Sequence, residues 1–338
     1  MDELASVVIP NWNRHSETLE CIKSVLLQDY ASVEVIVVDN GSTDGSVEAI
    51  KKIYPKVKVV ENKTNQGFAR ASNQGIRESK GEYVLTLNND AVAEKNWITE
   101  LVKASESRKD VGMCASKMVF MQDESTINST GIIPFKTGYA IDRGFGERDK
   151  GQYELQEEVF GPCAGAALYR RDALEDVKLD EMYFDEDYFC YSEDADLAWR
   201  MQLAGWKCRY VPTAKVRHTH SSTSIEGSAL KTYYMKRNSF ATTIKNSSTK
   251  NLILYAPFIA AYNAVVFPFY LMMGGGSATA FAKAVVDTLL SMKRTLEKRR
   301  RIQPQRKAES KDVDKWFKNP ENPLTALKRN KFAQGINK

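Results

Sequence analysis

Short apolar runs alternate with stretches of helical periodicity through the first 110 residues, and this rhythm constrains the fold more than any other feature. Runs rich in β-branched residues predict strands at residues 6–10, 33–39, 57–61 and 83–88. Apolar residues recurring every three or four positions predict helices at residues 15–28, 46–53 and 68–78. Because strands and helices alternate with short loops, we expect an α/β fold with a doubly wound, mostly parallel sheet.

Polar residues cluster where three of these predicted strands end, at residues 11–13, 39–44 and 88–90. In open parallel sheets, ligands bind beyond the carboxyl ends of the strands. We therefore expect the three clusters to form one site. Two of the clusters also have a simpler explanation, since Asp39 can cap the following helix and an N-N-D sequence is a common polar turn.

Two further groups carry candidate chemistry. Glu193 and Asp194 begin an amphipathic helix, where acids complement the helix dipole or, alternatively, one carboxylate acts as a general base. Acidic residues crowd this region from Asp185 onward, and their repulsion would raise a pKa. Two of the three histidines, His218 and His220, lie in V-R-H-T-H and are either structural or metal ligands.

Other nucleotide-binding classes lack support in the sequence. No G-x-x-x-x-G-K sequence is present, and no G-x-G-x-x-G follows the first strand, which argues against kinases, ATPases and dinucleotide-dependent dehydrogenases. The segment G-F-A-R-A-S-N places Arg70 and Asn73 near the sheet edge, where they could grip a diphosphate. Asp90 could hold Mg²⁺ or Mn²⁺ against such a diphosphate.

The charge is unevenly distributed along the chain. Residues 251–338 contain 16 Lys and Arg against 6 Asp and Glu, whereas the whole chain has a net charge of only +5. No charged residue occurs from 252 to 282, and residues 252–273 are long enough to span a bilayer, although Pro257 and Pro268 interrupt them. A packed or oligomer-forming helix, an interfacial element and a transmembrane span are all compatible with this pattern. We expect docking on an anionic membrane rather than on nucleic acid, because few aromatics are interleaved with the basic residues.

The cysteines and the N-terminus bear on the compartment. The five cysteines are scattered and no C-x-x-C pair occurs, which favours a reducing environment without a disulfide framework. The chain begins M-D-E-L-A-S-V-V-I-P, and this apolar run is too short for a signal peptide. We therefore expect a cytoplasmic protein, peripheral on the inner face of the cell membrane.

Several motifs occur in a characteristic order: V-V-I-P-N-W-N-R, V-V-D-N-G-S-T-D-G-S, N-Q-G-F-A-R-A-S-N-Q-G, L-N-N-D-A, G-A-A-L-Y-R-R-D-A-L, Y-S-E-D-A-D-L-A-W-R-M and V-P-T-A-K-V-R-H. In this order they resemble the inverting glycosyltransferases of family 2, which have the GT-A fold. Within that family the chain most resembles bacterial rhamnosyltransferase-like enzymes that build cell-surface polysaccharides. The resemblance covers about residues 5–245.

The resemblance implies a division of the chain. Residues 1–245 would form the catalytic domain, with a nucleotide-sugar half at 1–110 and an acceptor half at 111–245. Residues 246–338 would form a basic helical appendage that associates with a membrane or mediates homo-oligomer formation.

The resemblance also implies roles for individual residues. Asp194 would be the general base, with Glu193 as its neighbour, and Asp90 and His218 would bind Mg²⁺ or Mn²⁺. Asn88 stands where the family's D-x-D motif has its first acid, so Asp90 would be the main carboxylate ligand. The nucleotide sugar would contact Pro10, Asn11, Asn13, Asp39, Asn40, Arg70, Asn73 and Asn89.

The implied reaction transfers a sugar, with L-rhamnose from dTDP-rhamnose as our first expectation, to a hydroxyl of a glycan or lipid-linked glycan. A UDP-hexose donor is the alternative within the family. A sugar nucleotidyltransferase would need a Gly-rich, basic loop after the first strand, where this chain has N-W-N-R-H-S-E. A non-catalytic glycan-binding scaffold would have no need to keep Asp39, Asp90, Asp194 and His218.

Overall fold

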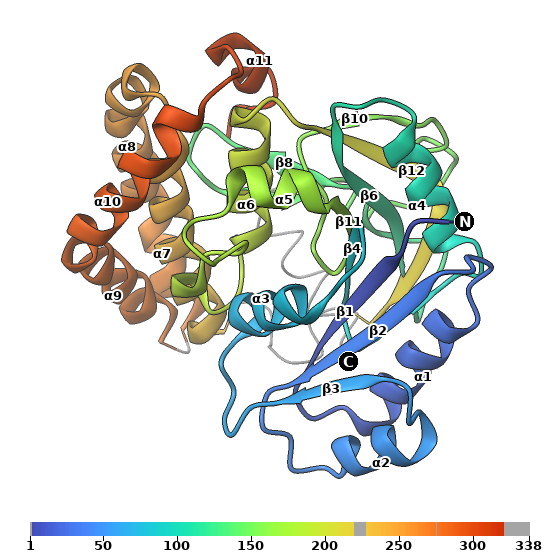
Figure 1. Cartoon of the computed structure of the whole chain (residues 1–338). Coiled ribbons are helices and arrows are strands. Elements are labelled where there is room, and N and C mark those ends of the chain that lie inside the picture. The colour runs from blue at the N-terminus through green and yellow to red at the C-terminus, as the bar shows by residue number, and fades with distance from the viewer. Residues whose placement is uncertain (1, 220–227, 275, 321–338) are drawn as a thin grey trace.

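The computed structural model describes residues 2–219, 228–274 and 276–320 (Figure 1). Its centre is a ten-stranded sheet, whose main path runs β10-β12-β6-β11-β4-β1-β2-β3, with β5 paired to β12 and β7 to β6. A separate two-stranded sheet pairs β8 with β9. The strands are β1 (Ala5–Asn11), β2 (Val33–Asp39), β3 (Lys58–Glu61), β4 (Tyr83–Leu87), β5 (Ala91–Ala93), β6 (Val111–Phe120), β7 (Ile127–Ser129), β8 (Ile132–Pro134), β9 (Ala140–Asp142), β10 (Glu157–Val159), β11 (Ala166–Arg170) and β12 (Lys207–His218).

The first half of the sheet confirms the predicted parallel arrangement. Strand β1 pairs in parallel with β2 and β4, and β2 pairs in parallel with β3. In the register of β1 and β2, Asn11 lies opposite Asp39 at the carboxyl edge. Both strands are buried along most of their length, which explains their continuous β-branched composition.

One antiparallel strand joins the two halves of the sheet. Strand β11 runs antiparallel to both β4 and β6, whereas β6 and β12 pair in parallel. Two reversals restore the original direction, so β12 ends at the same edge as β1, β2 and β4. His218, the last residue of β12, is thereby brought to that edge.

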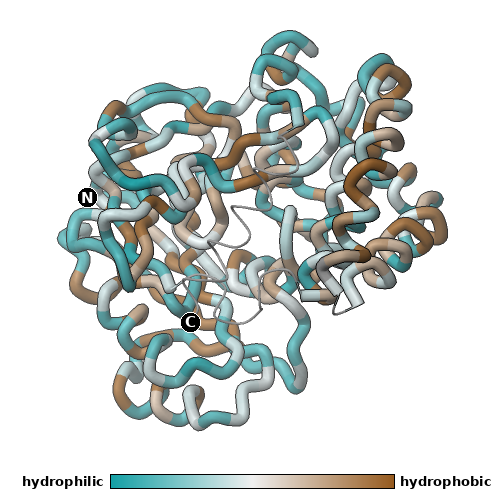
Figure 2. Tube along the Cα trace, turned by 180° about the vertical axis from the view of Figure 1, so that it is seen from behind, coloured by the Kyte–Doolittle hydropathy of each residue, from teal (hydrophilic) through white to brown (hydrophobic). Residues whose placement is uncertain are grey.

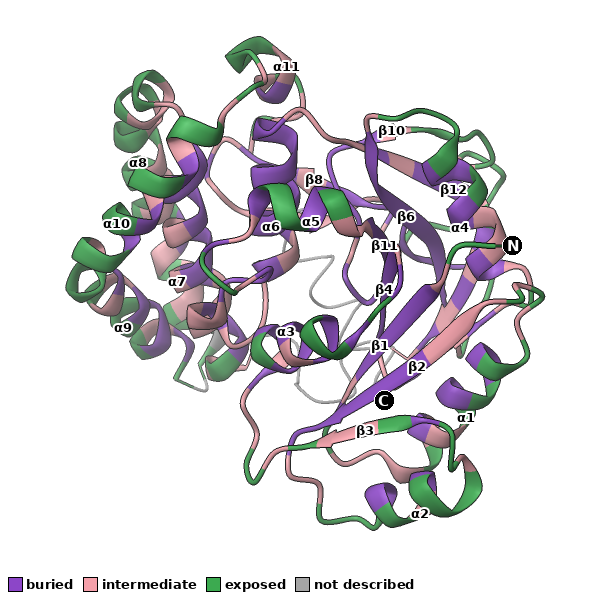
Figure 3. Cartoon of the chain, viewed as in Figure 1, coloured by how far each residue is buried: buried purple, intermediate pink, exposed green. Residues whose placement is uncertain are grey.

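Helices cover both faces of the sheet, as a doubly wound fold requires (Figure 3). Buried residues of α1 (His15–Leu26), α2 (Ser46–Ile53) and α4 (Trp97–Glu106) share one core cluster with one face. Buried residues of α3 (Phe68–Glu78), α5 (Arg171–Val177) and α6 (Glu193–Leu203) share a second cluster with the other face. The central strands consequently lie between two apolar layers, while the outward helical faces are exposed.

The remaining helices form a group beside α6, visible at the left of Figure 1. These are α7 (Ala229–Asn246), α8 (Thr249–Met273), α9 (Ser277–Leu290), α10 (Met292–Ile302) and α11 (Ser310–Asp314), with 3-10 turns η1 (Glu186–Tyr188) and η2 (Gln303–Gln305). Ile302 and Val313 belong to the same core cluster as the buried residues of α6. The rings of Trp199 and Phe317 also pack together, with centroids 4.5 Å apart. The predicted boundary at residues 245 and 246 falls at the end of α7 and stays a prediction.

Helix α8 is apolar on its outer face. It is the one helix of the described residues that is long and apolar enough to cross a membrane, and only 6% of its most apolar window is buried. Its inner side contacts α9 through the rings of Phe267, Tyr270 and Phe281. Lys236 of α7 donates a hydrogen bond to Asn263 in the middle of α8, at 3.2 Å. Figure 2 shows hydrophobic residues along these outer helices.

Candidate functional site

A cavity of about 590 Å³ opens at the carboxyl edge of the sheet. Its walls come from the ends of β1, β4 and β12, from the β8–β9 hairpin, from the start of α6 and from α7. Of the residues predicted for the site, those lining the cavity are Pro10, Asn11, Asn40, Asn89, Asp90, Glu193, Asp194 and His218. Residues from widely separated parts of the chain are therefore brought together around one space.

Asn11 connects the polar clusters of the first half. Its side-chain amide donates to Asp39 Oδ1 at 2.8 Å, and its Oδ1 accepts from Asn89 Nδ2 at 2.8 Å and Thr18 Oγ1 at 2.7 Å. The side chain is almost fully buried, so these bonds are protected from water. Asn11 thus fixes the ends of β1, β2 and β4 relative to one another.

Asp39 organises the loop after β2 from beneath the cavity. Its Oδ2 accepts from the backbone N–H groups of Gly41 and Ser42, at 3.0 and 2.9 Å. Gly41 has a φ of 75°, and a Cβ there would lie 2.9 Å from backbone atoms of Lys63. The carboxylate is 2% exposed and is not among the lining residues of the cavity. In this structure Asp39 therefore shapes the loop that presents Asn40 to the cavity.

Asp90 and His218 form a buried pair across the cavity floor. His218 Nε2 lies 3.1 Å from Asp90 Oδ1 and 3.1 Å from Asn88 Nδ2. The other ring nitrogen, Nδ1, lies 3.0 Å from Asn128 Oδ1, an acceptor to which it can only donate. A proton held at Nδ1 leaves Nε2 as an acceptor, which faces the Asn88 amide and lies beside the Asp90 carboxylate. A histidine oriented in this way by a second residue is the usual arrangement of a metal ligand.

The donor set suits a hard divalent cation that also binds a phosphate. Within the described part of the chain, no group of three or more His, Cys, Asp or Glu side chains could hold a metal ion. Mg²⁺ and related ions commonly take one or two protein ligands and complete their coordination with substrate phosphates and water. One carboxylate and one imidazole nitrogen therefore fit such a shared site. His220, the other histidine of the motif, lies outside the described residues.

A strained turn presents Glu193 and Asp194. Phe189, Tyr191 and Ser192 have φ values of 60°, 68° and 66°, a region that side-chain-bearing residues seldom adopt. The turn ends at the first residue of α6, so both acids lie in the helix's first turn. Asp194 accepts hydrogen bonds from the backbone N–H groups of Ala195 at 2.8 Å and Ala164 at 3.3 Å. Its carboxylate is thereby fixed in the cavity wall.

Burial raises the pKa of both acids. Desolvation, followed by the charge of Asp142, raises the pKa of Asp194 to about 6, although hydrogen bonds from backbone N–H groups oppose this rise. Desolvation, followed by the charge of Asp194, raises the pKa of Glu193 well above its usual range. Glu193 Oε2 is buried and has no hydrogen-bond partner among the described residues. A carboxyl group with a pKa near neutrality is suited to accept a proton during a reaction.

Four predicted residues do not line the cavity: Asp39, described above, and Asn13, Arg70 and Asn73. Asn13 binds the loop after β2, with its backbone N–H donating to Ser42 Oγ at 2.8 Å. Arg70 points toward Glu186 at 3.7 Å and is half exposed. Asn73 is fully buried, donating to the Phe184 carbonyl at 2.8 Å and accepting from the Phe184 N–H at 2.8 Å. Its side chain therefore fastens α3 to the segment before η1.

Sequence reasoning missed several residues of the site. Asp142 of β9 and Asn128 of β7 lie in the irregular middle region, where no periodicity or motif marks them. Lys231 of α7 also lines the cavity, with its ammonium 5.2 Å from the centre of the Tyr191 ring. The polar character of these side chains was visible in the sequence, but their approach to Asp90 and Asp194 depends on tertiary packing.

Comparisons with known proteins agree with this geometry. The glycosyl transferase family 2 model matches residues 6–178. The glycosyltransferase GlyG of Streptococcus pneumoniae is 36% identical over 111 residues, covering 32% of this chain and 37% of that protein. The N-acetylglucosaminyl-diphospho-decaprenol L-rhamnosyltransferase of Mycobacterium tuberculosis is 29% identical over 240 residues, covering 64% of this chain and 76% of the relative. Three of the curated relatives are matched over only 37%, 42% and 53% of their own length.

A solved structure shares the fold. The mannosyltransferase PcManGT from Pyrobaculum calidifontis, in complex with GDP-Man and Mn²⁺, superposes with a TM-score of 0.53 at 18% identity. The superposition covers 98% of this chain and 87% of that protein. The predicted GT-A architecture is therefore confirmed at the level of the fold.

Proposed function

The chain belongs to glycosyl transferase family 2, and we propose that it is an inverting enzyme that moves a sugar from a nucleotide donor to an acceptor hydroxyl. The observation that carries this proposal is the shared cavity, whose lining includes both the Asp90–His218 pair and Asp194. The Asp90–His218 pair can hold a diphosphate through a metal ion, and Asp194 can take a proton.

The reaction is a direct displacement. The acceptor oxygen attacks the anomeric carbon while its proton passes to the Asp194 carboxylate. The bond between that carbon and the diphosphate oxygen breaks, and the nucleoside diphosphate leaves with the bonding electrons. Because Asp194 has a pKa of about 6, it is ionised at neutral pH and ready to accept the proton.

We propose that the nucleotide lies over the ends of β1 and β2. Pro10, Asn11 and Asn40 line the cavity there, and Asn89 lines it next to Asp90. We propose dTDP-rhamnose as the first donor to test, because one relative is named as an L-rhamnosyltransferase. A UDP-hexose is the alternative donor within the same family.

Asp90 and His218 would hold Mg²⁺ or Mn²⁺ in this proposal. The bound ion would neutralise charge on the departing diphosphate. Asn128 supports this assignment, because its contact with His218 Nδ1 keeps Nε2 available as a ligand. The fold relative from Pyrobaculum calidifontis has Mn²⁺ and GDP-Man in its structure, which is consistent with this donor set.

We further propose that residues 246–338 bring the enzyme to the cytoplasmic face of an anionic membrane, where a lipid-linked glycan is the acceptor. Ile253, Leu254 and Val265 of α8 are exposed, and α10 carries Lys293 and Arg300 at its surface. Exposed apolar area and Lys or Arg together favour binding at an anionic lipid interface. The bond between Lys236 and Asn263 favours an interfacial position of α8 over a span, because a span would separate it from α7.

Vesicle flotation tests the membrane proposal. Val265→Asp places a charge on the exposed face of α8, where Val265 is 61% exposed, and Leu155→Asp is a control at an 80% exposed leucine elsewhere. We expect flotation with phosphatidylglycerol vesicles, weaker flotation with phosphatidylcholine, and loss of binding in the Val265 variant alone. Equal flotation of both variants and the parent would refute this surface, and light scattering would show whether α8 instead joins two copies.

A donor panel tests the reaction. The protein is incubated with dTDP-rhamnose, UDP-glucose, UDP-N-acetylglucosamine and GDP-mannose, with Mn²⁺ or with a chelator, and the release of nucleoside diphosphate is followed. We expect release from one donor class, dependent on the metal and abolished by Asp194→Asn. Release of pyrophosphate from a nucleoside triphosphate and sugar phosphate would point to a nucleotidyltransferase instead. Binding of glycans without turnover of any donor would point to a scaffold.

A further inference from the structure

The turn that carries Asp194 is held in place by helices outside the family-model match. Phe189, Tyr191 and Ser192 all have positive φ, and each such residue costs on the order of 1 kcal/mol or more. A strained segment of this kind persists only where its surroundings fix it. The contacts that fix it come mainly from α7 and α10, which begin after residue 178.

Asn238 of α7 makes the most direct contact with this turn. Its Nδ2 lies 3.0 Å from the Tyr188 carbonyl, 2.8 Å from the Cys190 carbonyl and 2.7 Å from the Tyr191 carbonyl. The side chain is completely buried. One amide group therefore serves three closely spaced carbonyls in and before the strained turn, with one of its two hydrogens shared.

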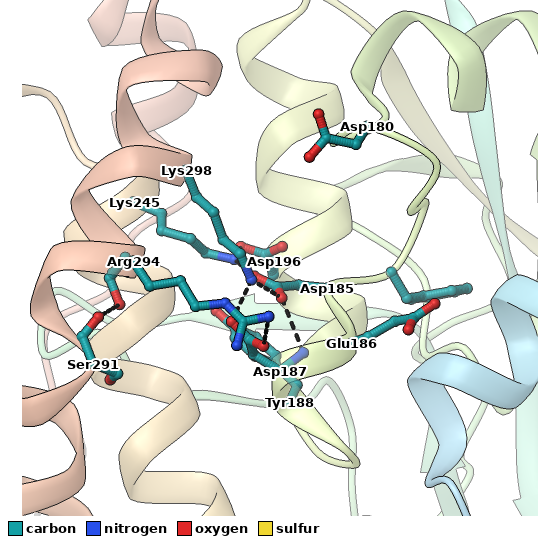
Figure 4. A network of polar contacts seen from close by, with 12 residues as sticks. Asp180, Asp185, Glu186, Asp187, Tyr188, Asp196, Lys245, Ser291, Arg294 and Lys298 are labelled. Carbon is teal, nitrogen blue, oxygen red and sulfur yellow. Dashed lines mark hydrogen bonds and ion pairs between the residues drawn. The ribbon is translucent and has the colours of Figure 1, made fainter.

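A cluster of charged residues holds both ends of the same segment (Figure 4). Lys245 of α7 bridges Asp185, before the turn, and Asp196, after it, with a distance of 2.9 Å to Asp196. Lys298 of α10 bridges Asp185 and Asp187, with a distance of 2.5 Å to Asp187. Burial alone would raise the pKa of Asp185, but Lys245 and Lys298 outweigh it and lower the pKa. The segment is therefore tied at its start to charges on α7 and α10 and at its end to a charge on α7.

We propose that α7 is a structural part of the active site and that Asn238 is a positioning residue for the base. The Asn238 amide fixes the carbonyls of Tyr188, Cys190 and Tyr191, so that α6 begins where it directs Asp194 into the cavity. Asp194 reaches the acceptor, whereas Asn238 acts only through the turn. This inference rests on the proposed role of Asp194 as the base.

Substitutions on α7 separate positioning from general stability. Asn238→Ala removes the three contacts, and Thr242→Val is a milder second variant, because Thr242 Oγ1 lies 2.7 Å from the Tyr188 hydroxyl in the same segment. Ser239→Ala is the matched control, since Ser239 is buried beside Asn238 and its hydroxyl donates within α7 to the Met235 carbonyl at 2.6 Å. All variants are made in the full chain.

Three readouts apply to each variant. Hydrogen–deuterium exchange reports the order of residues 186–194. Titration with Mn²⁺ and the nucleoside diphosphate of the active donor reports the affinity of the cavity for that nucleotide. The pH dependence of nucleoside diphosphate release reports the environment of Asp194.

For Asn238→Ala we expect faster exchange in residues 186–194, unchanged nucleoside diphosphate affinity and turnover reduced about 100-fold with little change in donor KM. The acidic limb of the pH profile should move to lower pH, because a released turn admits water to Asp194 and lowers its pKa. Thr242→Val should change in the same direction by about tenfold in turnover, and Ser239→Ala should match the parent.

The inference is overturned if exchange in residues 186–194 is the same in Asn238→Ala and the parent, or if turnover falls equally in Asn238→Ala and Ser239→Ala. The inference is also overturned if Asn238→Ala loses turnover while the acidic limb of its pH profile stays where it is in the parent, because that result indicates only a loss of folded protein. If the parent releases no nucleoside diphosphate from any donor, the proposed function fails, while the exchange measurement still decides whether Asn238 orders the turn.

Discussion

Replacing Asp194 by asparagine should remove catalysis and increase stability at the same time. Asp194 has a pKa raised from 3.8 to about 6, mainly by burial. Because the folded-state pKa is the higher one, ionised Asp194 opposes folding; this penalty is small below about pH 4 and complete above about pH 6. A rise of this size corresponds to about 3 kcal/mol. Asparagine stays neutral at every pH and so avoids the penalty.

The expected gain is smaller than this figure, because asparagine has only one acceptor oxygen for the two backbone donors, Ala164 and Ala195. Loss of one such bond costs about 1 kcal/mol, which leaves a net gain of about 2 kcal/mol near pH 7.5. For a chain of this size, that gain raises Tm by roughly 3 °C. Near pH 4 the gain should nearly vanish, since Asp194 is then mostly protonated in the folded protein.

Asp196, two residues along α6, provides a control of opposite sign. Burial would raise its pKa, but Lys245 and Arg200 outweigh burial and lower it. Asp196→Asn breaks these buried contacts and should destabilise the protein by roughly 3 kcal/mol. Thermal unfolding of both variants near pH 7.5 and pH 4 gives the stability, and nucleoside diphosphate release gives the activity, which Asp194→Asn should lower by about 100-fold to 10,000-fold. A Tm for Asp194→Asn that falls equally at both pH values, or full activity in that variant, would refute the reasoning.

Three other predictions follow from contacts of the same cavity. Asp142→Asn removes a charge that raises the pKa of Asp194, so the acidic limb of the activity profile should move to lower pH; an unmoved limb would contradict this. Asn128→Ala releases His218 Nδ1, and calorimetric titration with Mn²⁺ and a nucleoside diphosphate should show affinity lowered by about 10-fold to 100-fold; unchanged affinity would exclude the metal assignment. Asp39→Ala leaves buried donors of the following loop unpaired, so nucleoside diphosphate titration should show affinity lowered about tenfold, and equal affinity would show that the loop does not contact the nucleotide.

The parallel half of the fold was predictable from the sequence because its signals are local. The helix predicted at residues 68–78 has the bounds of α3, and the strand predicted at 33–39 has those of β2. The direction of β11 was not predictable, because a buried apolar run has the same composition in either orientation. The same limit applies to the β8–β9 hairpin, whose short strands lack a repeating pattern.

Site residues that follow the ends of predicted strands could be identified from the sequence. Site residues whose position depends on how helices pack could not. The strand that Asp90 follows was predicted, but only the family resemblance paired Asp90 with His218, which the structure places 3.1 Å apart. Arg70 was misplaced relative to the cavity because residue spacing alone does not give the rotation of α3, which turns this side chain toward Glu186. Asn238 looks like an ordinary polar residue of an amphipathic helix, and only the packing of α7 against the turn gives it three acceptors.

The ties between α10, α7 and the turn before α6 limit how such enzymes can be recombined. Consider a chimera joined near residue 178, where the family model ends. Asp194, Lys245 and Lys298 then come from the same parent only if the exchanged block continues through α10. Crossover points inside α7 would separate Asn238 from the carbonyls it serves or from Lys245. Exchange of segments between relatives is therefore best attempted with residues 111–245 and the C-terminal helices inherited as one block.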